Sequence, residues 1–315
     1  MKILLSPGIY LPHQRAGSEI CLHRICQYLI SKGHEVKAVT RYPVDYSYEG
    51  IEVYSQKKDY KTCHNHLWEW ADLVFCQLSG TYYAMNKQRI SPKKIINFTH
   101  NNAGYPQVDI RKNVFTVYNT EQSKKELNYN QETYVLHPPV NYRDYENVDT
   151  SKAEYITLIN HNENKGGKIL IEIAKRMPNH KFLAVQGGYY LQITDAKVLN
   201  IKYVGITDDI RKYLAMTKLL IAPSEYDSYG MAQVEALCCN IPIIASDIPG
   251  FRESLSDSAI YVNRNDVDAW VEAIKNSDQL FKNKKPLERA KELDPVKELA
   301  KFEKWLLKIS KLAVK

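Results

Sequence analysis

Residues 219–253 contain the pattern that most constrains how this chain can fold. An apolar run at 219–222 is followed by an acidic loop, a helical pattern at 231–239 and a second apolar run at 243–246. Short apolar runs that alternate with helices predict a parallel α/β sheet. Ligands of such sheets bind beyond the carboxyl ends of the strands, so the loop at 223–230 is predicted to be a binding loop.

This loop and the helix after it combine two kinds of ligand-binding group. Asp227 ends the acidic part of the loop, and Glu235 lies about one turn into the helix, where we expect it to face the same crevice. Between them, the backbone amides of residues 228–231 are predicted to be available at the helix start. Carboxylates accept hydrogen bonds from hydroxyl groups, while amides and the helix dipole hold phosphate oxygens. The expected ligand is therefore rich in hydroxyls and phosphates.

The same stretch resembles the nucleotide-sugar site of the retaining glycosyltransferases with the GT-B fold, glycosyltransferase family 4. The matching positions are Pro223, Ser224, Asp227, Tyr229, Gly230, Glu235 and Ala236. Most members carry glutamate where this chain has Asp227, which is one methylene shorter, so Glu225 could share its work. A surface acidic loop that caps an ordinary helix is the plainer alternative, and the flanking matches favour the functional interpretation.

The resemblance implies a donor site in the second half of the chain. Glu235 would bind the ribose, and Ile206 lies in the loop that faces the nucleobase in this family. Asp227 would hold the transferred sugar together with a run of backbone amides, which belong to Ser228, Tyr229, Gly230 and Met231. The resemblance implies no metal and no cofactor, because the nucleotide diphosphate sugar is itself a substrate. UDP-glucose is the expected donor, from its frequency in the family.

Three more loops match the family in part. Lys165, followed by a glycine, corresponds to a lysine that neutralises the donor diphosphate; most members add an arginine just upstream, whereas residues 160–162 here are Asn, His and Asn. Gly17 corresponds to a glycine loop that approaches the phosphates, although the family usually has two adjacent glycines. His100 corresponds to a histidine near the transferred sugar. The plainer alternatives are a solvated lysine, a helix cap and a loop histidine bonded to backbone.

The family resemblance also implies a mechanism. The acceptor hydroxyl approaches the anomeric carbon on the side of the leaving group, the departing diphosphate takes its proton, and the configuration is retained. Asp227, His100 and Lys165 are the predicted catalytic residues.

The chain of 315 residues is long enough for two domains. The resemblance implies a GT-B fold, with two Rossmann-like domains facing across a cleft. We expect an acceptor domain at 1–140, a nucleotide-sugar domain at 153–292, and a terminal helix at 293–315 that crosses back to the first domain. This tail is amphipathic and basic, so a helix on a membrane surface is the alternative.

Composition adds expectations about location. No apolar run is long enough to span a membrane, and the N-terminal residues are expected to form a buried strand rather than a signal peptide. Peripheral membrane contact stays compatible with the tail. The six cysteines lie mostly in apolar segments and are expected to be reduced core thiols of a cytoplasmic protein. The Cys63-His64-Asn65-His66 run has no second ligand pair at zinc spacing, so a polar loop is favoured over a metal site.

The acceptor is left open. The net charge is +5 over residues 1–140 and +2 over the remainder, which fits an acidic acceptor and fits an ordinary lysine-rich surface equally well. The acceptor is expected to be acidic or polyhydroxyl. A saccharide, lipid or polyol of the cell envelope is expected. DNA with hydroxymethylated pyrimidines is an alternative, supported by the basic first half and its tyrosines, Tyr42, Tyr46, Tyr48, Tyr54, Tyr60, Tyr82, Tyr83 and Tyr105. The motifs would also fit a nucleotide-sugar epimerase or hydrolase of the same fold, or a non-catalytic binder of nucleotide sugars.

Overall fold

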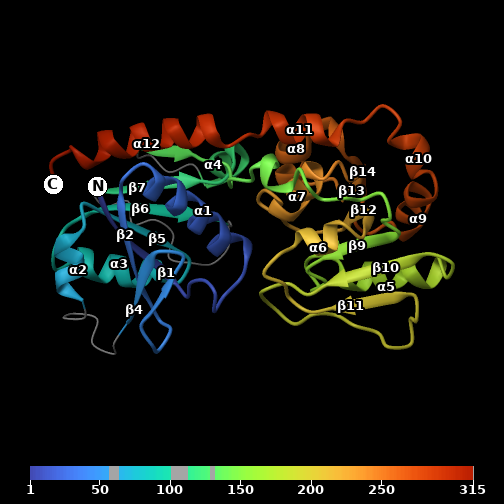
Figure 1. The fold of residues 1–315 in the computed structure, drawn as a ribbon, viewed down its shortest axis with the longest axis horizontal. Coiled ribbons are helices and arrows are strands. Elements are labelled where there is room, and N and C mark those ends of the chain that lie inside the picture. The colour runs from blue at the N-terminus through green and yellow to red at the C-terminus, as the bar shows by residue number, and fades with distance from the viewer. Residues whose placement is uncertain (57–63, 101–112, 128–131, 315) are drawn as a thin grey trace. The chain divides into compact units, whose positions relative to one another are not determined.

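The computed structural model describes residues 1–56, 64–100, 113–127 and 132–314 (Figure 1). The chain forms two compact units. Unit 1 comprises Met1–Pro139 and Val296–Lys315, and unit 2 comprises Val140–Pro295. Each unit is built on its own, mostly parallel sheet.

Unit 1 contains, among its described residues, an eight-stranded sheet in the order β3-β4-β2-β1-β5-β6-β7-β8. All neighbouring strands are parallel except β3 and β4. The strands are β1 (Lys2–Gly8), β2 (Glu35–Thr40), β3 (Tyr46–Tyr48), β4 (Ile51–Ser55), β5 (Leu73–Gln77), β6 (Lys94–Thr99), β7 (Val114–Tyr118) and β8 (Thr133–Val135). The central strands are continuous buried runs, as expected for a parallel sheet covered on both faces.

The described helices of unit 1 include one from the far end of the chain. They are α1 (Gly17–Ser31), α2 (Asn65–Trp70), α3 (Gly80–Gln88), α4 (Glu121–Leu127) and α12 (Val296–Ser310). Helix α12, red in Figure 1, packs its buried Phe302 against Phe98 of β6 and Tyr134 of β8. The ammonium of Lys94 donates to the carbonyl of Ser310 at 2.5 Å. The amphipathic face of the tail is therefore covered by unit 1.

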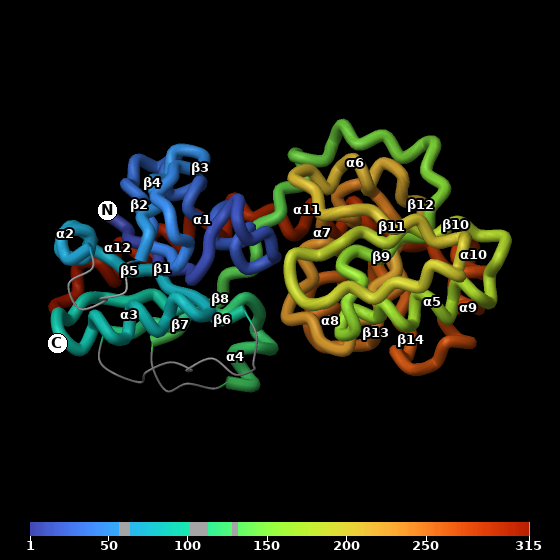
Figure 2. Tube along the Cα trace, turned by 90° about the horizontal axis from the view of Figure 1, so that it is seen from below, coloured from blue at the N-terminus to red at the C-terminus, as the bar shows by residue number. Residues whose placement is uncertain are grey.

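Unit 2 has, within its residues, a six-stranded parallel sheet in the order β11-β10-β9-β12-β13-β14 (Figure 1; seen from below as a Cα trace in Figure 2). The strands are β9 (Tyr155–Ile159), β10 (Lys181–Val185), β11 (Ile201–Val204), β12 (Thr217–Ala222), β13 (Ile243–Ser246) and β14 (Ile260–Val262). Strands β9 to β11 are added in one direction and β12 to β14 in the other. The order therefore reverses between β9 and β12, which is the point where sheets of this kind bind ligands.

Helices cover both faces of this second sheet. They are α5 (Gly167–Arg176), α6 (Arg211–Leu214), α7 (Met231–Cys238), α8 (Pro249–Leu255), α9 (Val267–Lys275), α10 (Ser277–Leu280) and α11 (Pro286–Glu292), with short 3-10 turns η1 (Tyr142–Tyr145) and η2 (Ser256–Ser258). Helices α5 and α9 pack around the buried Trp270. Helices α7, α8 and α11 contribute to a second apolar cluster around Phe251.

Helix ends in unit 2 follow local signals in the sequence. Asp266 caps α9, since its carboxylate accepts from the amide of Ala269 at 2.9 Å. Asn240 ends α7 with a left-handed φ of 56°, and the amide of Ile241 returns to the carbonyl of Ala236 at 3.0 Å. The pair Pro249-Gly250 looks like a turn in the sequence, but it starts helix α8, because proline is favourable at a first helical position.

The described cysteines are buried in both units and free. Burial raises the pKa of the Cys21, Cys76 and Cys239 thiols to about 12. The expectation of core thiols is therefore confirmed for these residues together with Cys26 and Cys238, while Cys63 lies outside the described residues.

Candidate functional site

The loops after β9 and β12 meet at one edge of the second sheet. Because these strands are parallel neighbours, their carboxyl ends lie side by side. The amide of Glu225 donates to the carbonyl of Asn164 at 2.8 Å, which joins the two loops. Gly166 has a φ of 92°, and a Cβ added there would lie 2.4 Å from Cγ of Pro223. Only glycine lets the loops approach this closely.

Lys165 and Asp227 form an ion pair where the loops meet. Lys165 Nζ lies 2.5 Å from Asp227 Oδ2, and the two side chains are only 14% and 17% exposed. The ammonium also donates to the carbonyl of Tyr226 at 3.4 Å and contacts the hydroxyl of Tyr189. Burial acts to lower the pKa of Lys165, but Asp227 and Tyr189 outweigh it and leave the pKa above its ordinary value. The lysine is therefore a charged group held in a sheltered place.

Residues 160–162, which precede Lys165, stabilise the conformation of its loop. The carboxamide oxygen of Asn162 accepts from the amide of Lys165 at 2.9 Å. His161 Nδ1 donates to the carbonyl of Ile193 at 2.8 Å, and burial lowers the pKa of this imidazole. Asn160 adopts a left-handed φ of 65°. These side chains shape the loop around Lys165 and bring no second positive charge.

Arg264 is a residue of this edge that the sequence analysis did not single out. It follows β14, and its guanidinium donates from Nε to the carbonyl of Pro223 at 3.2 Å and from Nη2 to the carbonyl of Glu163 at 3.1 Å. One cation thus ties the two site loops together. The only sequence signal for Arg264 as a site residue is its position just after a strand. It was missed because that strand, β14, was not predicted.

The start of α7 supplies the backbone part of the site. Gly230 has a φ of 86° and precedes the first helical residue, Met231. The carbonyl of Gly230 accepts the first hydrogen bonds of the helix, from the backbone amides of Gln233 and Val234. The amide of Met231 thus lies outside the helical ladder, as predicted. Glu235 lies in the next turn and is 7% exposed.

Ser228 and Tyr229 connect Asp227 to this helix. Tyr229 is buried in the apolar cluster of unit 2, so its side chain is part of the core. A Cβ at Gly250 would lie 2.0 Å from the carbonyl oxygen of Asp227, which shows how closely α8 supports the loop. Ile206 is 49% exposed in the loop that follows β11.

The remaining predicted site residues, Gly17 and His100, belong to unit 1. Gly17 is the first residue of α1. His100 follows β6, and its Nε2–H donates to the carboxamide oxygen of Gln77 at 2.8 Å. Its partner is thus a side chain rather than backbone. Burial lowers the pKa of His100 to about 4, so the ring is neutral at physiological pH.

The tyrosines of the first half are not one exposed surface. Tyr83 is 3% exposed and packs against Trp68. Tyr42 stacks on His13 with ring centroids 3.5 Å apart, and Tyr46 meets the same ring edge-on. Tyr82 is 54% exposed. Tyr60 and Tyr105 lie outside the described residues.

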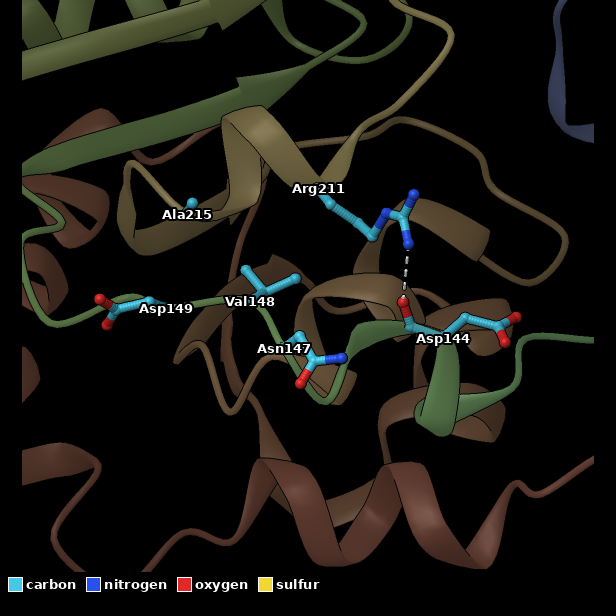
Figure 3. A pocket seen from close by; sticks show the side chains of 6 residues that line it. All are labelled: Asp144, Asn147, Val148, Asp149, Arg211 and Ala215. Atoms are coloured by element: carbon cyan, nitrogen blue, oxygen red, sulfur yellow. Dashed lines mark hydrogen bonds between the residues drawn. The ribbon is translucent and has the colours of Figure 1, made fainter.

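A separate hollow of about 290 Å³ lies elsewhere in unit 2 (Figure 3). Its lining residues are Asp144, Asn147, Val148, Asp149, Arg211 and Ala215. Arg211 points towards the backbone of Asp144 and donates to its carbonyl at 3.3 Å. These segments lead into the amino ends of β9 and β12, so the hollow is not at the edge that carries Lys165.

Two further results concern metals and membranes. Within the described ranges, no group of three or more His, Cys, Asp or Glu side chains is arranged to hold a metal ion, and Cys63 lies outside those ranges. None of the helices seen in the described part of the chain combines the length and the apolar character needed to cross a membrane.

Comparison with solved structures defines the class of fold. The chain is similar to Anabaena Alr3699/HepE in complex with UDP-glucose, with a TM-score of 0.79 and 16% identity over 98% of this chain and 99% of that one. It is also similar to sucrose-phosphate synthase from Thermosynechococcus elongatus, with a TM-score of 0.74 and 15% identity over 98% of both chains. The two parallel-sheet units have the GT-B fold.

Sequence comparison narrows the class for unit 2. Residues 155–277 match the family model described as glycosyl transferases group 1. The chain is 46% identical over 61 residues to O-antigen chain mannosyltransferase RfbU of Salmonella typhimurium, and 32% identical over 71 residues to O-antigen chain mannosyltransferase B of Escherichia coli.

These matches cover 19% and 22% of this chain and only 17% and 19% of the two relatives. The matched family range includes Lys165, Asp227 and Glu235. The chain thus combines the GT-B fold with a match to the glycosyl transferases group 1 model at residues 155–277.

Proposed function

We propose that the protein is a retaining, metal-independent glycosyltransferase of family 4. It transfers a hexose from a nucleotide diphosphate sugar to a hydroxyl of a saccharide, lipid or polyol acceptor of the cell envelope. The observation that carries the proposal is the Lys165–Asp227 pair at the reversal point of the second sheet, beside the start of α7. A cation, a carboxylate and helix amides are the groups that an activated sugar requires.

The ion pair suggests how the donor is recognised. A diphosphate carries more negative charge than one carboxylate, so it competes with Asp227 for the ammonium of Lys165. When Lys165 turns to the phosphate, the Asp227 carboxylate becomes available to a sugar hydroxyl. Binding of the diphosphate is thereby coupled to binding of the sugar through the charge of Lys165.

The same groups act in the transfer step. The acceptor hydroxyl attacks the anomeric carbon on the face that the diphosphate leaves, and the departing phosphate oxygen takes the hydroxyl proton. Lys165 and the amides near Gly230 stabilise the negative charge that grows on the diphosphate, usually the largest electrostatic contribution in such a step. In this proposal Glu235 binds the ribose, Ile206 faces the nucleobase, and Gly17 and His100 act from unit 1 as the family resemblance implies.

Two donors are the first to test. Similar solved structures are named as complexes with UDP-glucose, or with UDP and glucose, and the curated relatives named above are mannosyltransferases. We expect stabilisation of the protein by UDP-glucose or by GDP-mannose in a thermal-shift panel of nucleotide sugars. Mass analysis of saccharide and polyol acceptors then checks for the added hexose. Stabilisation by none of the nucleotide sugars would contradict the proposal.

The same assay separates the competing functions. Turnover of donor at an equal rate without acceptor would identify an epimerase or hydrolase. Salt-sensitive binding to duplex DNA, followed by hexose transfer to hydroxymethylated bases, would identify the nucleic-acid acceptor. We propose the saccharide type first, because several tyrosines of the first half pack within unit 1.

A further inference from the structure

Unit 1 contains a buried carboxylic acid that the proposed reaction does not use. Glu19 lies in the first turn of α1 and is 0% exposed. Its Oε2 accepts from the hydroxyl of Ser18 at 2.9 Å. Its Oε1 accepts from the carboxamide nitrogens of Gln14 at 3.3 Å and Gln77 at 3.5 Å.

Gln77 connects this acid to His100. It is the last residue of β5 and is fully buried. Its carboxamide nitrogen faces Glu19, and its carboxamide oxygen accepts from Nε2 of His100 at 2.8 Å. Glu19 lies in the helix that follows β1, Gln77 ends β5, and His100 directly follows β6. These three strands are neighbours in the sheet, so the chain of hydrogen bonds runs along the carboxyl edge of the first sheet.

The chemistry of the three groups fixes the direction of this chain of bonds. A carboxylate can only accept, so a charged Glu19 requires Gln77 to turn its NH2 group towards it. The oxygen of Gln77 then faces His100 and can only accept. The ring must therefore carry its proton on Nε2, and a neutral ring keeps a free lone pair on Nδ1.

We propose that Glu19 is a positioning residue that acts through Gln77 to hold His100 as the Nε2–H tautomer, so that Nδ1 accepts a hydrogen bond from a substrate hydroxyl. The last part, the use of Nδ1 in transfer, rests on the proposed function. The tautomer itself does not, and it can be measured without substrate.

The charge state of Glu19 makes the arrangement dependent on pH. Burial raises the pKa of Glu19 to about 7, against the hydrogen bonds from Ser18 and Gln14 that lower it. A second titratable group that interacts with it is the buried thiol of Cys21 on the same helix, whose pKa is also raised by burial. Below pH 7 the protonated acid becomes a donor, and the Gln77 carboxamide is free to reverse.

Nitrogen-15 NMR of the histidine rings tests the tautomer directly, with His100→Asn used to assign the signals. In the wild-type protein at pH 8 we expect His100 as Nε2–H. In Glu19→Gln we expect both tautomers, because the Gln77 carboxamide can then reverse. In Gln77→Met we also expect both, because that carboxamide is removed. Glu126→Gln, an exposed charge loss on α4, should match the wild type. An Nδ1–H ring in the wild type, or an Nε2–H ring unchanged in both variants, would overturn the assignment.

Transfer kinetics test the consequence. We expect Glu19→Gln to lower kcat at pH 8 about tenfold with donor KM within twofold of the wild-type value, while Glu126→Gln changes neither. Wild-type kcat in Glu19→Gln, despite a changed tautomer, would refute the role in transfer. If the wild-type protein transfers no sugar at all, the proposed function fails, and the NMR result still decides whether Glu19 sets the tautomer.

Discussion

At the scale of single residues, the Lys165–Asp227 pair is the feature that the sequence could not supply. The family resemblance assigned Lys165 to the diphosphate and Asp227 to the sugar of the donor, and the structure places their charged atoms 2.5 Å apart. Spacing along the chain carries no information on this contact, because 61 residues lie between them. The contacts of Arg264 were equally invisible, since its guanidinium donates to backbone carbonyls of two distant segments.

Removal of the lysine tests how the pair affects stability. We expect Lys165→Met to lower the free energy of unfolding by about 2 kcal/mol, because the sheltered Asp227 carboxylate loses its partner. Asp227→Asn in the same background should restore most of this loss. Urea denaturation of the wild type, the two single variants and the double variant measures both effects. Equal destabilisation by Lys165→Met with and without Asp227→Asn would show that the pair is not coupled.

Glu19 gives a stability prediction with a definite sign. Its pKa in the folded protein is about 7, above the ordinary value of 4.5. Between these two pH values the folded protein keeps the Glu19 proton, whereas the unfolded chain releases it. The stabilisation of the folded state by this retained proton is complete below pH 4.5 and is lost as the pH rises through 7. The stability of Glu19→Gln relative to wild type should therefore rise by about 3 kcal/mol between pH 4.5 and 8. Denaturation curves that differ equally at both pH values would argue against this.

At the scale of elements, apolar runs predicted the neighbouring strands β12 and β13 of the second sheet, β13 to the residue. The missed elements include several without a clear period, namely β3 (Tyr46–Tyr48), α3 (Gly80–Gln88), α8 (Pro249–Leu255) and β14 (Ile260–Val262). Helix α3 begins at Gly80, where an added Cβ would lie 1.7 Å from the carbonyl oxygen of Ser6. Gly80 is required because the backbone of Ser6, far away in the sequence, packs against it. In the sequence alone, a glycine at this position indicates a turn.

Gly166 offers a test of how the site loops are held. Gly166→Ala should cost about 3 kcal/mol of stability and weaken donor binding, because it adds the clash with Pro223 to the strain of a left-handed backbone. Gly33→Ala is the matched control, since Gly33 has a φ of 83° with no atom within 4 Å, and should cost about 1 kcal/mol. Urea denaturation compares the two. Equal losses would show that the approach of the loops is not tight.

At the scale of the whole molecule, the chain length and the family resemblance predicted two Rossmann-like domains. The structure has two mostly parallel α/β units, and the comparisons identify the GT-B fold. The residues proposed for one reaction are divided between the units, with Lys165, Asp227 and Glu235 in unit 2 and Gly17 and His100 in unit 1. The sequence motifs predicted the loops that carry them. The acceptor was beyond reach, because the first half of the chain carries charge and aromatic rings but no comparable motif.

The most direct test of the central claim is the donor affinity and transfer rate of Glu235→Gln, with the exposed Glu272→Ala on α9 as control. We predict that Glu235→Gln stays folded and weakens both the thermal shift by the active nucleotide sugar and hexose transfer at least tenfold, because the ribose loses a charged acceptor. The control should behave as wild type. Near-normal donor binding and turnover in Glu235→Gln would contradict the assignment of this edge of unit 2 as the nucleotide-sugar site.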